Sequence, residues 1–314
     1  MIWVLTTFSV QAEPWRFQRE LMGTRFTIVC HAEDSAWAKR QAEAAFKVAE
    51  EVDRVASDYL ADSELASLTS LPVFQPVVLS PLLFDLLTHA RALAEKTHGA
   101  FDPTLGPFTR LWRQTRQQRR LPEVAVLEAA RLATGWRHFS LDPTSRRVTL
   151  HREAMSFDLG GVAKGYSADL MLESLATAGL RQAMVAAGGD IRLGDPPPGR
   201  EGWRVAVQTQ DLTRHDEVRV LANAAISTSG DLHQSVEIEG VRYSHILDPA
   251  TGLGLTRRMA ATVIADEAKL SDALATAACV MGPGAAEALQ KLPGVREVKI
   301  RVVEDLTTGH RKDR

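Results

Sequence analysis

An acid and a hydroxyl stand four positions apart in a stretch of small apolar residues near the C-terminal end of the chain. The stretch reads LSDALATAACVMG and carries Asp272 and Thr276. With 3.6 residues per turn, both side chains lie on one face of a predicted helix, one turn apart. Their oxygens could bind one hard cation such as Mg²⁺. Alternatively, Asp272 complements the helix dipole and Thr276 bonds back to the carbonyl one turn earlier.

A glycine-rich segment, DLGGVAKG at residues 158–165, is a second candidate for chemistry. It places two glycines and Lys164 at the predicted start of a helix, where free backbone N–H groups and the dipole attract a phosphate. It departs from the Walker A motif, because Ala163 precedes the lysine and Gly165 follows it. The later AAGGDIRLGD lacks the GxGxxG pattern of dinucleotide-binding folds. The alternative is a tight strand-to-helix turn with Lys164 on the surface.

Two further segments carry polar residues. AISTSGD, residues 225–231, packs three hydroxyls and a glycine into what we expect to be one turn, either a polar loop near an anion or a plain turn. YSHILDPATG, residues 243–252, runs from a predicted strand into a turn through His245 and Asp248. His245 is a reactive imidazole or a half-buried structural one. A Ser-His-Asp hydrolase is conceivable, but no GxSxG elbow supports it.

Composition narrows the function classes. A formal net charge of −2, with no run of five like charges, argues against a nucleic-acid-binding protein. The basic RQTRQQRR, residues 113–120, is interpreted as a solvated loop or a helix end. Cys30 and Cys279 lie far apart, and no CxxC or HExxH is present, so neither a disulfide framework nor a zinc site is expected. No segment is long enough to span a membrane.

The N-terminal segment resembles an export signal. Residues 1–12 begin with an apolar stretch and reach VQA, which fits a signal-peptidase cut after Ala12, although the positive n-region is missing. We expect residues 1–12 to be a signal-peptide remnant and the protein to be periplasmic or otherwise exported. The alternatives are a first strand and a cytoplasmic protein.

The elements that must position these residues follow from hydrophobic periodicity and caps. At 314 residues and 45% hydrophobic content, the chain can bury a sizeable core, and it has no repeat and no linker. The expected helices begin at residue 34 or 35, at 80–81, at 122, after 161, at 272 and at 284. The helix from 80–81 is expected to stop at Gly99, and the helix after 161 to end at Gly179. The expected strands are 25–32, a hairpin at 138–150, 183–187, 203–207, 218–221, 235–246 folded about 239–240, 259–265 and 295–303. This mixture predicts an α+β fold, with mixed or antiparallel sheets covered by helices.

Taken together, the segments resemble the FAD:protein FMN transferase family, the ApbE-like flavin transferases. The matching pieces cover about residues 20 to 300 and are, in order, MGTRFTI, SDYLADSELASL, GAFDPTLGPFTRLW, DLGGVAKGYSADL, AAGGDI, ISTSGD, YSHILDPATG and SDALATAACVMG. Each piece is weak alone, but their order and spacing are specific. The resemblance implies an ApbE-like architecture, related to the T-fold, in a single domain at residues 13–314.

The resemblance also implies site residues. In the family, Mg²⁺ is held by the Asp and Thr of the DALAT-like helix and by a backbone carbonyl, which map to Asp272, Thr276 and Gly161. His245 is the candidate base. The implied flavin contacts are Met22, Tyr59, Ala100, Phe101, Asp102, Asp158, Lys164 and Leu247.

The implied reaction is protein flavinylation, a post-translational modification. A Thr or Ser hydroxyl of a target flavoprotein attacks the FMN-side phosphorus of FAD, and AMP leaves. The family suggests as target a subunit of a membrane electron-transfer complex. The alternatives on the same site are an FAD diphosphatase that releases FMN and AMP, and a non-catalytic FAD-binding protein.

Three positions depart from or vary within the family pattern. Thr69 stands where many relatives have Asn, and Ala275 where some have a further Asp, which leaves fewer acids for a metal. Position 59 varies within the family, and Tyr59 could stack on the flavin or adenine ring.

Overall fold

The computed structural model describes residues 14–207, 217–230 and 234–302. The predicted signal segment, residues 1–12, lies outside these ranges. Among the described helices, none is both long and apolar enough to cross a bilayer.

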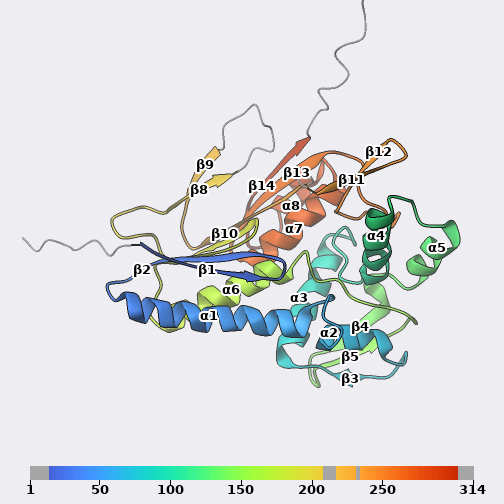
Figure 1. Cartoon of the computed structure of the whole chain (residues 1–314), viewed down its shortest axis with the longest axis horizontal. Coiled ribbons are helices and arrows are strands. Elements are labelled where there is room, and N and C mark those ends of the chain that lie inside the picture. Colours follow the sequence, from blue (N-terminus) through green and yellow to red (C-terminus); the bar gives the residue numbers. More distant parts are fainter. Residues whose placement is uncertain (1–13, 208–216, 231–233, 303–314) are drawn as a thin grey trace, which may run out of the picture.

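A seven-stranded antiparallel sheet organises the described residues (Figure 1). Its order is β1 (Pro14–Leu21), β2 (Thr24–His31), β6 (Ala183–Ala187), β7 (Asp190–Leu193), β10 (Ala224–Gly230), β13 (Met259–Ala265) and β14 (Val295–Val302). Because β10 pairs with both β7 and β13, its side chains lie in the middle of the sheet.

Helices cover one face of this sheet (Figure 1). They are α1 (Ser35–Ala56), α6 (Ala163–Thr177) and α7 (Ala268–Met281), with α8 (Ala285–Gln290) beside β14. α1 begins where the Asp34 carboxylate accepts hydrogen bonds from the N–H groups of Ala36 and Trp37, and its alanine-rich stripe packs on α6. Alternate residues of β6, Ala183, Val185 and Ala187, face this layer.

A two-stranded sheet covers part of the opposite face. It consists of β8 (Trp203–Val207) and β9 (Glu217–Leu221). The inward side chains of β8, Trp203, Val205 and Val207, form one apolar cluster with Ile226 of β10 and Ile264 of β13. The period-two alternation of a strand thus directs neighbouring residues of β10 to different layers.

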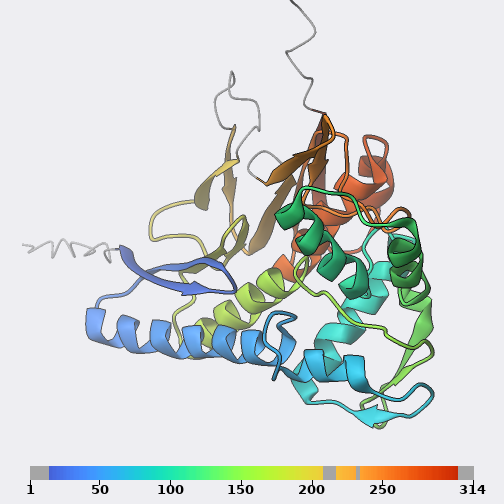
Figure 2. The same cartoon turned by 45° about the vertical axis from the view of Figure 1, so that its right-hand side comes forward.

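The remaining elements pack beside the helical layer (Figure 2). They are α2 (Glu64–Ser67), the 3₁₀ turns η1 (Leu68–Ser70) and η2 (Trp136–His138), α3 (Pro81–Lys96), α4 (Gly106–Gln118), α5 (Val124–Leu132), the sheet β3 (Val77–Val78), β5 (Arg147–Leu150) and β4 (Phe139–Asp142), and the hairpin β11 (Ser235–Ile238) and β12 (Val241–Ser244). One apolar cluster joins α3 and the β3–β5–β4 sheet to α7.

The predicted α+β class is confirmed, and most predicted elements are present within two to four residues of their expected bounds. One assignment was wrong: 225–230 is strand β10 rather than a turn. Its hydroxyls have partners on neighbouring elements, since Thr228 meets Thr262 at 3.0 Å and Ser227 meets Ser271 at 2.8 Å between side-chain oxygens. Helix α4, whose last turns hold much of the basic segment, and strands β1, β3 and β7 were not predicted.

Candidate active site between helices α6 and α7

The close approach of α6 to α7 depends on Gly165. A Cβ at this position would lie 2.3 Å from the carbonyl oxygen of Ala268 and 2.9 Å from the Cβ of Asp272. The absent side chain therefore lets the first turn of α6 contact α7 directly. The Gly165 N–H donates a hydrogen bond of 3.0 Å to Oδ2 of Asp272, which fixes that carboxylate against α6.

The N-terminus of α7 is capped by a different acid. Asp169 of α6 accepts hydrogen bonds from the N–H groups of Ala268 at 2.8 Å and Lys269 at 2.9 Å, and Arg192 pairs with it at 2.9 Å. Asp169 thus satisfies the first donors of the helix and complements its dipole. Asp272, one turn further along, bonds instead to the Gly165 N–H of α6, so its carboxylate does not cap α7.

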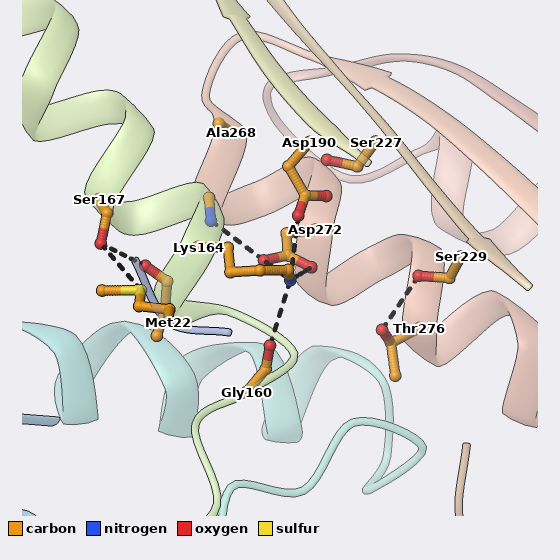
Figure 3. A network of polar contacts seen from close by, with 12 residues as sticks. Met22, Gly160, Lys164, Ser167, Asp190, Ser227, Ser229, Ala268, Asp272 and Thr276 are labelled. Carbon is orange, nitrogen blue, oxygen red and sulfur yellow. Dashed lines mark hydrogen bonds and ion pairs between the residues drawn. The ribbon is translucent and has the colours of Figure 1, made fainter. Parts of the chain in front are cut away.

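Lys164 is held between two buried acids, which argues against the alternative of a free surface lysine (Figure 3). Its Nζ lies 3.0 Å from Oδ2 of Asp190 and 3.3 Å from Oδ2 of Asp272, and it donates to the carbonyl of Gly160 at 3.3 Å. The side chains of Asp190 and Asp272 are 5% and 4% exposed. An ammonium group this well surrounded neutralises one of two adjacent buried charges.

The electrostatics of this cluster favour a cation. Burial, and after it the charge of Asp190, raise the pKa of Asp272 to about 7, although Lys164 and the Gly165 N–H oppose the shift. Burial alone lowers the pKa of Lys164, but the charges of Asp190 and Asp272 outweigh it and raise that pKa above its ordinary value. The lysine is therefore an ammonium ion, and the site prefers additional positive charge.

Thr276 and Gly161 complete a set of oxygen donors. Thr276 Oγ1 lies 3.2 Å from Ser229 Oγ of β10, and a Cβ on Gly161 would lie 3.5 Å from Thr276 Oγ1. Asp272 and Thr276 project from the same helix, as Figure 3 shows. A carboxylate, a hydroxyl and a carbonyl are the donors that suit Mg²⁺. The described residues contain no group of three or more His, Cys, Asp or Glu side chains suited to a metal, so a metal here depends on this mixed set.

The loop before α4 is shaped by Asp102. Its carboxylate accepts hydrogen bonds from the N–H and Oγ1 of Thr104, at 2.8 and 2.6 Å, and from the Trp136 N–H at 3.0 Å. Burial raises its pKa. Beside it, Ala100 is half-buried, and the Phe101 ring lies 3.4 Å from the Cβ position of Gly161. The side chain of Asp102 thus holds the loop that presents Phe101 to the glycine-rich segment.

Asp158 anchors the glycine-rich turn to α4. Its Oδ1 accepts a 2.8 Å hydrogen bond from the Gly160 N–H, and its Oδ2 accepts one of 2.6 Å from Thr109 Oγ1. These contacts define the entry to α6, where Lys164 and Gly165 follow.

Tyr59 and Met22 lie at the margins of this region. Tyr59 is 76% exposed, and the Arg113 guanidinium lies 3.8 Å from its ring centre while pairing with Asp58 at 2.5 Å. In this structure Tyr59 stacks on an arginine. Met22 has a left-handed backbone, with φ of 49°, and its Sδ accepts a hydrogen bond from Ser167 of α6.

His245 and Leu247 follow β12. The Nδ1 of His245 lies 3.2 Å from the carbonyl oxygen of Gln234. Since a carbonyl only accepts, Nδ1 donates in this contact, and in a neutral imidazole Nε2 is then the acceptor nitrogen. The side chain of Leu247 is buried in an apolar cluster with Phe108 and Trp112 of α4.

The structure therefore joins Gly161, Lys164, Asp272 and Thr276 in one place, with Phe101 against Gly161. Sequence analysis missed Asp190, Ser229 and Asp169, which hold these residues in position. A signal for Asp190 existed, because this acid directly follows an apolar run, AMVAA, and a Gly-Gly pair.

Comparison with known proteins gives consistent matches. The model of the ApbE family matches residues 22–298. The chain is similar to the FAD:protein FMN transferase of Vibrio cholerae, with 32% identity over 75% of this chain and 72% of the relative. It is also similar to that of Chlamydia muridarum, with 29% identity over 87% and 88%.

Solved structures agree with the sequence matches. The apo form of the Pseudomonas stutzeri flavinyl transferase ApbE aligns with a TM-score of 0.82 and 28% identity over 94% of this chain and 93% of that one. The flavin transferase ApbE from Vibrio cholerae aligns with a TM-score of 0.83 and 29% identity over 94% and 95%.

Proposed function

The chain belongs to the ApbE family and is a transferase, and we propose that it moves FMN from FAD to a Thr or Ser hydroxyl of a target flavoprotein, with Mg²⁺ bound and AMP released. The observation that carries the proposal is the buried carboxylate of Asp272, which lies against α6 beside an ammonium group and one helical turn from the Thr276 hydroxyl.

The residues present fit a hard cation. We assign Mg²⁺ to Asp272, Thr276 and the carbonyl of Gly161, because all three offer oxygen and the surrounding charge is favourable. The bound ion supplies charge neutralisation for the two phosphates of FAD and for the leaving oxygen of AMP.

Phosphoryl transfer depends mainly on positioning and on charge stabilisation. The acceptor hydroxyl oxygen forms a bond to the FMN-side phosphorus, and the bond from that phosphorus to the bridging oxygen breaks, so AMP keeps that oxygen. Lys164 adds positive charge near the diphosphate. The turn fixed by Asp158 and the loop fixed by Asp102 orient the flavin half.

His245 is the proposed general base. With Nδ1 donating to Gln234, the lone pair of Nε2 accepts the proton of the attacking hydroxyl. An imidazole is the side chain most often used for this task.

The acceptor is a flavoprotein with a Ser/Thr-containing motif, and we propose that it is a subunit of a membrane electron-transfer complex. The names of the relatives support a protein acceptor and FAD as donor. We further propose that this chain acts after export to the periplasm, on the ground of the signal-like residues 1–12.

The test is mass spectrometry of a candidate acceptor domain incubated with this protein and FAD, with Mg²⁺ and again with a chelator. We expect a mass gain equal to one FMN only with Mg²⁺, lost when the acceptor Thr is changed to Ala. FAD consumed to FMN and AMP without a mass gain would favour the diphosphatase. FAD bound and left intact under Mg²⁺, with every acceptor tried, would favour the binding protein.

A further inference from the structure

Asp190 has no role in the proposed reaction, yet it makes the shorter of the two ion pairs of Lys164. It begins β7, directly after the turn from β6, and faces Ser227 of β10 in the sheet register. The residue is 4% exposed, and its Oδ2 lies 3.0 Å from Lys164 Nζ, closer than either oxygen of Asp272. Figure 3 shows the ammonium group between the two acids.

Lys164 and a bound metal ion would compete for the carboxylate of Asp272. Its ammonium group contacts the carboxylate that we assign to Mg²⁺, so a cation that binds Asp272 must share this acid with a positive charge or displace it. Two positive charges within a few ångströms repel strongly in a buried site. A lysine that loses its acid partner there would be a partly buried charge without a counter-ion, which is costly. A second acid that stays paired with Lys164 removes both difficulties.

We propose that Asp190 is a positioning residue that retains the Lys164 ammonium group when Mg²⁺ takes Asp272, so that Lys164 is an internal cation that the metal displaces. The inference rests on the magnesium part of the proposed function. Asp190 acts through Lys164 and is not itself a metal ligand.

A double-mutant cycle on Mg²⁺ affinity tests this assignment. Isothermal titration calorimetry measures Mg²⁺ binding to the full chain, alone and with FAD, for the wild type, Asp190→Asn, Lys164→Met and the double variant. Asp190→Asn leaves Lys164 with Asp272 as its one acid, and we expect the Kd for Mg²⁺ to rise about tenfold. Lys164→Met removes the competing charge, so the double variant should return to within about threefold of the wild-type Kd.

The direct-ligand alternative gives a different result. If Asp190 coordinates Mg²⁺, removal of Lys164 does not restore affinity, and the double variant binds as weakly as Asp190→Asn. That result, or an unchanged Kd in Asp190→Asn, overturns the proposal. If the wild type binds no Mg²⁺ with or without FAD, the proposed function is contradicted instead. The wild-type titration comes before the variants, so the two failures are distinguished.

A crystal structure of the wild type with Mg²⁺ gives a second measurement that needs no variant to fold. We expect Lys164 Nζ within hydrogen-bond distance of Asp190 and beyond it from Asp272. Coordination of the metal by Asp190, or Lys164 still paired with Asp272, overturns the proposal. Activity adds a third readout: Asp190→Asn should need more Mg²⁺ for half-maximal transfer yet recover most of the wild-type rate at saturating Mg²⁺.

Discussion

The main-chain N–H of Gly165 donates a 3.0 Å hydrogen bond to Oδ2 of Asp272, and this bond ties the first turn of α6 to α7. It is possible because residue 165 has no side chain, since a Cβ would meet the Ala268 carbonyl at 2.3 Å. The contact brings a lysine from the glycine-rich segment to an acid more than a hundred residues later. The close packing of α6 on α7 is therefore what allows Lys164 and Asp272 to meet.

Gly165→Ala should consequently separate the two helices. The added methyl group meets main-chain atoms of α7 that cannot rotate away, and overpacking of this kind costs about 1–3 kcal/mol. We expect a lower free energy of unfolding in urea and a loss of Mg²⁺ affinity in calorimetry. Gly284→Ala is the matched control, because φ there is −77° and nothing lies within 4 Å of the new Cβ. Equal stability and affinity in both variants would contradict the role of Gly165.

Thr276→Val tests the hydroxyl ligand at constant shape. If Oγ1 binds the metal, the variant should lose at least about tenfold in Mg²⁺ affinity, whereas Thr276→Ser should retain most of it. The control is Thr88→Val on α3, where the hydroxyl donates to the Phe84 carbonyl and the residue is exposed. Calorimetry with Mg²⁺ measures all three. Wild-type affinity in Thr276→Val would remove this residue from the ligand set.

Local signals predicted much of the fold. The cap at Asp34 and the alanine stripe after it were sufficient for α1, and Ser80-Pro81 for the start of α3. Such signals depend on neighbours within one turn. They failed for 225–230, where hydroxyls usual in turns are satisfied by partners on other elements, as Thr228 is by Thr262. Hydrogen bonds between distant segments cannot be read from composition.

The site residues also divide into those that local sequence signals predict and those whose contacts depend on the fold. The shared helix face predicted that Asp272 and Thr276 project together, and the family resemblance added Gly161 and Lys164. Asp190 was missed because its contact with Lys164 depends on how β7 of the sheet meets α6. Asp169 was missed as a cap for a similar reason, since it caps α7 from another helix.

His245→Gln should slow transfer without loss of FAD binding. Loss of a general base typically reduces the rate by about 10²–10⁴-fold, while most of the proposed flavin contacts lie on other elements. Single-turnover transfer measured by mass spectrometry gives the rate, and flavin fluorescence gives the affinity. His151→Gln, directly after β5, is the control for a histidine change elsewhere. A rate within about threefold of wild type in His245→Gln would exclude it as the base.

His89 should make stability depend on pH below neutrality. It lies on α3, and its Nε2 has no hydrogen-bond partner among the described residues. Burial, and after it the charge of Lys269, lower the pKa of His89 to about 4, although Glu267 and Asp85 oppose the shift. In the unfolded chain a histidine titrates near about 6.5. Between these values the unfolded state binds more protons than the folded state, so protons favour unfolding.

The contribution of His89 to the free energy of unfolding should therefore be largest above about pH 6.5. It should fall as the pH decreases toward 4, by up to about 3 kcal/mol. Urea denaturation at pH 7 and pH 5 measures the difference. His89→Gln should reduce it, because the replaced side chain no longer takes up a proton on unfolding. His98→Asn is the control, since His98 is exposed and Asn tolerates its positive φ of 53°. The same pH dependence in His89→Gln as in wild type would show that other groups cause it.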